Sequence, residues 1–148
     1  MQPLPHFYLV EANASATGAL SVAADGLADI EVSPPVQYGG SGDDWSPESL
    51  LMASVASCLI LSFRAVASAS KFPWLSIECE AQGKLDKVGN VTSFTDITTT
   101  VALTISADSD AERAGKLLEK AEQICLINNS LSAEKHFEYS IVSKNGTE

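Results

Sequence analysis

The stretch SPESLLMASVASCLILSFRAVASASK, residues 46–71, is the longest apolar segment of the chain and constrains its fold most. Ser46 is a favourable N-cap, Pro47 suits the first helical position, and Glu48 falls in the first turn, where the helix dipole favours a negative charge. A helix is therefore predicted to begin at Pro47 and to run to about Ser70. The sequence Lys-Phe-Pro-Trp then ends it, because a proline disfavours helical geometry at the residue before it.

Apolar side chains point in nearly every direction around this predicted helix. They are Leu50, Leu51, Met52, Val55, Leu59, Ile60, Leu61, Phe63 and Val66. A helix that is apolar all round has to be covered all round, and one domain with two predicted helices covers it poorly. We therefore predict that a second copy of the chain helps to bury it. Interspersed serines and Arg64 interrupt the apolar run, so no membrane span is predicted.

Alternation and turn signals indicate strands on both sides of this helix. The segments HFYLVEANA and LADIEVS have strand character, with a turn at Asp25–Gly26 between them. Apolar and polar residues alternate along LSIECEAQGKLD, and FTDITTTVALTIS is rich in Thr, Val and Ile. Two long strands are therefore predicted within residues 75–106, joined by a turn near residues 88–90.

A second helix and a closing strand complete the predicted order. The helix is predicted to be capped by Asp108 or Ser109 and to run to about Cys125, and FEYSIVS is predicted as the last strand. The order is then βββ-α-ββ-α-β, which is typical of an α+β fold with two helices packed on antiparallel sheets. The length fits a single domain over residues 1–148.

Charge and composition narrow the possible partners. The chain has a net charge of −10 and a pI of about 4.5, and its nine Lys and Arg residues are scattered. Nucleic acid is not an expected partner, because phosphate binding requires clustered basic residues. We expect a neutral or apolar small molecule or a second copy of the chain instead. The N-terminal sequence lacks the features of a secretory signal, so a cytoplasmic location is expected.

The three cysteines do not form the framework of a disulfide-rich secreted domain. A free cysteine is most often a small buried apolar residue, and Cys79, on the apolar face of a predicted strand, fits that description. Cys58 and Cys125 lie 67 residues apart, and no histidine stands at ligand spacing from either, so no metal site is predicted. His6 and His136 are each predicted to stand alone, without a base or a metal as partner.

Two segments carry a resemblance to a known family. GGSGDDWSPESLLMASVASC, together with AEQICLINNSL, resembles the OsmC/Ohr family of thiol peroxidases, in which a glycine-rich loop leads into a Pro-Glu-x-Leu helix start. The peroxidatic cysteine of that family follows ten residues after the glutamate, as Cys58 follows Glu48 here. Cys125 opens a segment similar to the family's C-P-x-S-N pattern, and Asn129 stands at the position of its asparagine. The strand and loop GLADIEVSPPVQYGGSG are similar as well.

The resemblance implies a fold, an activity and a set of roles. It implies an intertwined homodimer with two active sites at the subunit interface, and an antioxidant role in the oxidative stress response. Cys58 would attack an organic hydroperoxide, Cys125 would resolve the sulfenic acid as a Cys58–Cys125 disulfide, and an external dithiol would reset the pair without a bound cofactor. Glu48 would be the functional glutamate of the family.

The sequence departs from the family pattern in two places. The peroxidases usually carry an arginine in the first hairpin, whereas this chain reads ATGALSVAADG there, and Leu126 stands where proline is common. The alternative is an OsmC-like dimer that binds a small apolar ligand with little or no peroxidase activity. Tyr38, Trp45 and Asn129 are the candidate substrate-binding residues. A place in the dimer core is the other interpretation of Tyr38 and Trp45.

Overall fold

The computed structural model describes residues 1–107 and 110–144, so the predicted capping residues Asp108 and Ser109 lie outside the described residues. The chain divides into two compact units, Met1–Leu51 and Met52–Glu148. The single domain over residues 1–148 stays a prediction.

A small antiparallel sheet forms the first unit. Its strands β1 (Glu11–Asn13), β2 (Leu20–Ala23) and β3 (Ile30–Val32) pair in the order β1-β2-β3. The predicted turn at Asp25–Gly26 is confirmed, since Gly26 has φ +75° and the Leu27 N–H donates to the Ala24 carbonyl at 3.1 Å. The strand predicted within HFYLVEANA covers only its second half, and the preceding apolar side chains Phe7, Tyr8 and Leu9 are exposed.

A loop held by hydrogen bonds connects this sheet to the helix α1 (Pro47–Ala69). The loop contains one turn of 3-10 helix, η1 (Val36–Tyr38). Ser33 holds both ends of the loop together: its N–H donates to the Trp45 carbonyl at 2.9 Å, and its hydroxyl donates to Asp44 at 2.7 Å. The predicted helix start is confirmed, because the Ser49 N–H donates to the Ser46 hydroxyl at 3.1 Å.

The second unit is built on the sheet β4-β5-β6 with α2 (Ala111–Ile124) and the short α3 (Leu126–Asn129). The strands are β4 (Ser76–Val88), β5 (Val91–Ile105) and β6 (Glu134–Ser143). The hairpin β4–β5 is antiparallel and turns at Gly89, which has φ +62° and so favours glycine. This confirms the predicted turn.

The prediction of antiparallel sheets is wrong for β6, which runs parallel to β5. The reason is the connection between them. The chain returns along α2 and α3 before it enters β6, and a helical crossover of this kind joins parallel strands. The second sheet is therefore mixed, while the predicted α+β class and element order are confirmed.

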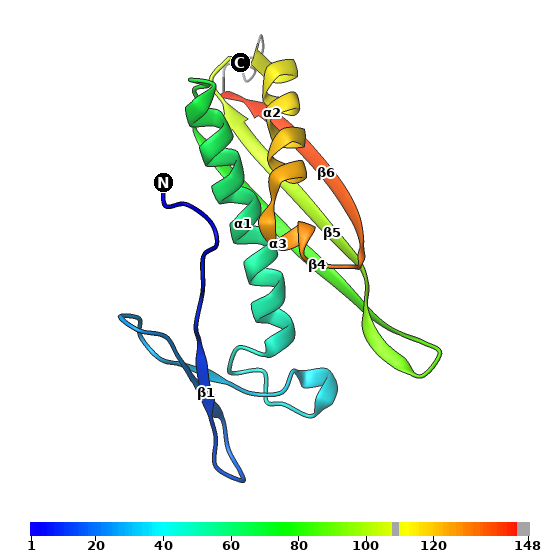
Figure 1. Cartoon of the computed structure of the whole chain (residues 1–148). Helices are drawn as coiled ribbons and strands as arrows, with labels where there is room; N and C mark the ends of the chain where they lie inside the picture. The colour runs from blue at the N-terminus through cyan, green and yellow to red at the C-terminus, as the bar shows by residue number, and fades with distance from the viewer. Residues whose placement is uncertain (108–109, 145–148) are drawn as a thin grey trace. The chain divides into compact units, whose positions relative to one another are not determined.

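Helices α1 and α2 lie on one face of the sheet β4-β5-β6 (Figure 1). The buried core contains Leu59 and Phe63 from α1, Val101 and Leu103 from β5, and Leu118 from α2. Because side chains alternate along a strand, the even-numbered residues of β5 from Asp96 to Thr104 point to the opposite face, whereas Phe94, before an irregularity in the strand pairing, packs on the helix side. The two faces of the sheet therefore differ, one apolar under helices and one polar.

Helix α1 is a partly buried core helix. Within the described part of the chain, it alone has the length and composition to cross a membrane, with a mean hydropathy of 2.0. Five of its residues are buried in the core: Val55, Leu59, Phe63, Val66 and Ala67. Leu61, by contrast, has 57% of its surface exposed. The apolar surface that the sequence predicts all round α1 is thus covered on one side only.

Candidate functional site

Two of the sequence-predicted residues, Cys58 and Cys125, meet in the second unit. Cys58 lies half-buried on α1, at the border of the core that contains Cys125. Cys125 is fully buried and forms the corner between α2 and α3, with extended backbone angles. Its thiol donates a hydrogen bond to the Cys58 sulfur. Cys58 and Cys125, which are far apart in the sequence, thus lie together as a pair of thiols, and neither is in a disulfide.

The surroundings of Cys58 favour its thiolate form. Burial by itself raises the pKa of Cys58, but hydrogen bonds to its sulfur more than offset this and hold that pKa below its ordinary value. The strongest comes from the Ile127 N–H and the next from the Cys125 thiol. The Leu126 N–H and the Ser62 hydroxyl contribute further. A lowered pKa matters because the thiolate, not the thiol, is the nucleophile.

The other two cysteines have raised pKa values. Burial raises the pKa of Cys125, and its hydrogen bond to Cys58 adds to that effect because the donor has to keep its proton. Burial likewise raises the pKa of Cys79 to about 11. The structure therefore separates one thiol with a lowered pKa from two thiols with raised pKa values, and Cys79 fits its predicted packing role.

Sequence reasoning missed the groups that surround Cys58. Ser62 follows it by four residues on the same helix, a spacing that places the two side chains side by side, so this signal was available. The N–H groups of Leu126 and Ile127 left no such signal. The departure at Leu126 has a chemical consequence, because a proline at that position would have no N–H to donate.

The chain has two arginines, and Arg113 is engaged away from the thiols. Its guanidinium donates to the Ser70 carbonyl and lies over the Phe72 ring, 5.3 Å from the ring centroid. The groups that lower the pKa of Cys58 are backbone N–H groups, a thiol and a hydroxyl. The named groups that lower the pKa of Cys58 are thus all neutral donors.

The first unit holds two more of the predicted residues, Glu48 and Tyr38, at one cavity of about 290 Å³. Most of its wall is apolar; the lining residues are Leu20, Val32, Ser33, Pro34, Pro35, Tyr38, Pro47 and Glu48. Within the described residues, the buried Oε2 of Glu48 has no hydrogen-bond partner. A carboxylate oxygen in that position can accept a hydrogen bond from a bound molecule.

Trp45 and Asn129 are placed differently. Trp45 is half exposed and is not among the residues that line this cavity. The Asn129 side chain donates to the Gln123 carbonyl at 3.1 Å and so ties α3 to the end of α2. Its neighbour Asn128 is the buried one, and its backbone N–H donates to the Cys125 sulfur. Asn129 therefore supports the corner that carries Cys125, and substrate binding by it stays a prediction.

The prediction that His136 stands alone is wrong. Its Nε2 lies 2.9 Å from the Asp96 Oδ1, although the two residues are 40 positions apart in the sequence. The parallel pairing of β5 with β6 brings them together. No local pattern in the sequence could have indicated this contact.

The chain is similar in sequence to proteins of one known family. The model of a family described as OsmC-like protein matches residues 40–140. An organic hydroperoxide resistance protein of Xanthomonas axonopodis pv. citri is 29% identical over 133 residues, which cover 85% of this chain and 89% of that protein. The match thus spans most of both chains.

Solved structures agree in fold. An OsmC-like protein of unknown function from Vibrio cholerae has a TM-score of 0.82 at 20% identity, covering 93% of this chain and 100% of that one. A putative organic hydroperoxide resistance protein from Vibrio cholerae, with captopril bound in one of its active sites, has a TM-score of 0.69 at 25% identity. That match covers 99% of this chain and 97% of the other.

Proposed function

The chain belongs to the OsmC-like protein family, and from that membership we propose that it is a cysteine-dependent peroxidase that reduces organic hydroperoxides. The observation that carries the proposal is the Cys58–Cys125 pair, in which one thiol has a lowered and the other a raised pKa. The similarity to proteins named for organic hydroperoxide resistance supports it. The proposal includes the roles of Cys58 as the attacking thiolate and of Cys125 as the resolving thiol.

The first step takes place at Cys58. Its thiolate attacks one oxygen of the R–O–O–H bond, so that an S–O bond forms and the O–O bond breaks. The peroxide gains the two electrons that the sulfur loses. The leaving alkoxide takes a proton from solvent and departs as the alcohol, and Cys58 becomes a sulfenic acid. The N–H groups of Leu126 and Ile127 stabilise the attacking thiolate before this step.

The second step uses Cys125. The Cys125 thiol gives up its proton as its sulfur attacks the Cys58 sulfur; an S–S bond forms, the S–O bond breaks, and the leaving hydroxide takes up one proton to become water. The proximity of the two thiols supports this role, because Cys125 already donates its hydrogen to Cys58. An external dithiol then reduces the disulfide by two exchange reactions and restores both thiols. No bound cofactor takes part in the proposed cycle.

We further propose that the working form is an intertwined cytoplasmic homodimer with a single domain over residues 1–148 in each copy. Apolar surface left uncovered supports the second copy: Phe7 and Tyr8 have 91% and 88% of their surface exposed, and Leu61 has 57%. The family match over residues 40–140 crosses the border between the two compact units, which supports one domain. In the dimer, Glu48, Tyr38 and Trp45 would contribute to the substrate pocket.

The test is the consumption of cumene hydroperoxide in the presence of a dithiol. The wild type is expected to consume it, Cys58→Ser to lose all activity, and Cys125→Ser to lose turnover. Cys125→Ser should still consume about one equivalent of peroxide, because its Cys58 can form the sulfenic acid without resolving it. A wild type no faster than Cys58→Ser would contradict the proposal.

A second candidate function is the binding of a small apolar ligand without peroxidase chemistry. The cavity of about 290 Å³ at Glu48 favours it, because its wall is mostly apolar and the Glu48 Oε2 inside it has no partner within the described residues. Under this alternative, a wild type without peroxidase activity would still bind an apolar small molecule. Quenching of tryptophan fluorescence by cumyl alcohol, lost in Glu48→Ala, would support it.

A further inference from the structure

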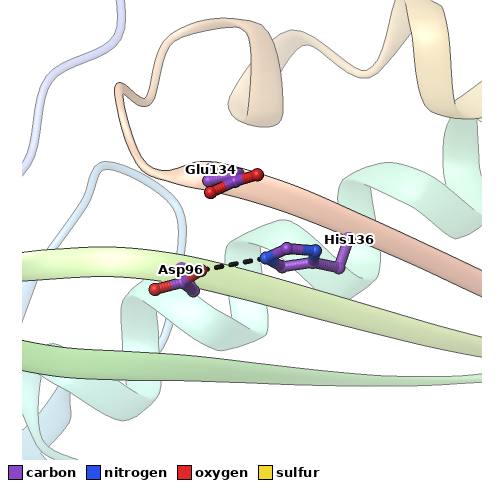
Figure 2. A group of neighbouring side chains, drawn as sticks. All are labelled: Asp96, Glu134 and His136. Atoms are coloured by element: carbon purple, nitrogen blue, oxygen red, sulfur yellow. Dashed lines mark hydrogen bonds and ion pairs between the residues drawn. The ribbon is translucent and has the colours of Figure 1, made fainter.

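We propose that Asp96, Glu134 and His136 form a binding site for a divalent transition-metal ion of the Zn²⁺ class. One ligand atom from each side chain lies within 4.8 Å of the other two. Figure 2 shows that His136 reaches Asp96 while Glu134 lies on the same strand as the imidazole. The site lies on the face of the second sheet that is opposite to the helices, and it shares no residue with the thiol pair.

Strand register holds the three side chains on this face. In the parallel pairing of β5 with β6, Asp96 stands directly opposite Glu134, and His136 is two residues further along β6. Residues two apart point to the same side of a strand. The imidazole is already oriented, because its Nε2 lies 2.9 Å from the Asp96 Oδ1. The backbone of two paired strands therefore sets the spacing without help from a loop.

The donor set selects the class of ion. One imidazole nitrogen and two carboxylate oxygens suit Zn²⁺ and its neighbours, whereas Mg²⁺ and Ca²⁺ prefer oxygen ligands alone. Two ligands bound at about 2.1 Å to a tetrahedral ion are roughly 3.4 Å apart. The separations here, 2.9 Å for one pair and at most 4.8 Å for the others, reach that value by small side-chain rotations.

Charge on this face favours a cation. Two carboxylates directly opposite each other on paired strands repel, and Asp96 and Glu134 stand in that arrangement. Glu138 lies on the same face of β6, while the Lys84 ammonium, on the other side of Asp96, is paired with Asp86 at 3.3 Å. Asp96 and His136 also line an open cavity of about 530 Å³, which leaves room for water to complete the coordination.

The experiment is isothermal titration calorimetry of the full chain with ZnCl₂, combined with thermal unfolding with and without the ion. We expect about one zinc ion per chain and a higher Tm, because an ion that binds only the folded state stabilises it. His136→Ala and Glu134→Gln should each lower the affinity by about tenfold or more. Glu134→Gln preserves the shape of an exposed side chain, so it tests the site even where His136→Ala disturbs the fold.

Two control variants distinguish this site from other zinc ligands. His6→Ala removes the only other histidine of the chain and should leave the affinity unchanged. Cys58→Ser/Cys125→Ser removes the thiol pair and should retain one bound ion. Zinc binding that disappears in this double variant but survives in His136→Ala and Glu134→Gln would overturn the proposal, as would a wild type that binds no zinc.

Discussion

Cys58 and Cys79 pack against the same core, yet their surroundings give them opposite chemistry. Cys58 lies on α1 next to the start of α3, where backbone N–H groups, a thiol and a hydroxyl donate to its sulfur and lower its pKa. Cys79 lies near the start of β4, where burial and nearby negative charges raise its pKa to about 11. Partial burial is thus common to both, and hydrogen-bond donors make the difference.

The groups that lower the pKa of Cys58 carry no charge. An arginine lowers a thiol pKa through its charge, whereas the groups around Cys58 act by hydrogen bonding to the charged form of the sulfur. Backbone donors need no side-chain ordering, because the fold already holds them in place. The activation of Cys58 therefore depends on how the corner at Cys125 directs the backbone of Leu126 and Ile127.

The largest expected effect is the difference in activity between two matched serine variants. Cys58→Ser should reduce peroxidase activity to the rate without enzyme, while Cys79→Ser should retain most of the wild-type rate, because only Cys58 is proposed to attack the peroxide. Steady-state consumption of cumene hydroperoxide measures both. Equal losses in the two variants, with both folded by circular dichroism, would break the comparison.

The second effect is the pH dependence of alkylation. A thiol reacts as the thiolate, which forms as the pH rises through its pKa, so Cys58 should be alkylated at a lower pH than an ordinary cysteine. Cys79 should stay unmodified until the pH approaches 11. At neutral pH Cys58 should be alkylated on the order of a hundredfold faster than Cys79, since the thiolate fraction falls about tenfold for each unit by which a thiol pKa is higher. Mass spectrometry of iodoacetamide-treated peptides gives both rates.

The third effect comes from Leu126→Pro, which removes one backbone donor. Proline fits the first position of a helix such as α3, so the fold should tolerate it. Loss of a hydrogen bond to a charged sulfur should raise the pKa of Cys58 by about one pH unit and slow its alkylation at neutral pH about tenfold. Leu126→Ala keeps the N–H and serves as the control. If the pKa of Cys58 in Leu126→Pro equalled its wild-type value, the Leu126 N–H would be unimportant for this pKa.

The smallest effect is expected for Ser62→Ala, because its hydroxyl is the weakest of the donors named for Cys58. Alkylation of Cys58 at neutral pH should slow by about two- to fivefold, which is the range for a modest hydrogen bond. Ser57→Ala is a matched control on the same helix, since the Ser57 hydroxyl donates to the Ala53 carbonyl at 2.7 Å. The same rate change in both variants would point to a general effect on α1.

Much of the fold follows from short stretches of the sequence. Ser46 and Pro47 mark the start of α1 because capping is decided by the residue and its next three neighbours. The alternation along β4 places Ile77 and Cys79 against the core, since the two faces of a strand are separated by a single residue. The direction of β6 did not follow, because alternation looks the same in a parallel and an antiparallel strand.

The sequence by itself determined where α1 begins, which face of β4 is buried, and, by resemblance to a family, which two cysteines to pair. Only the tertiary structure decided that Leu126 and Ile127 direct their N–H groups at Cys58, and that Asp96 meets His136 from 40 positions away. The physical reason is the range of the interactions. Capping and alternation act within a few residues, whereas a hydrogen bond between distant segments exists only after α2 and α3 have returned the chain to the sheet.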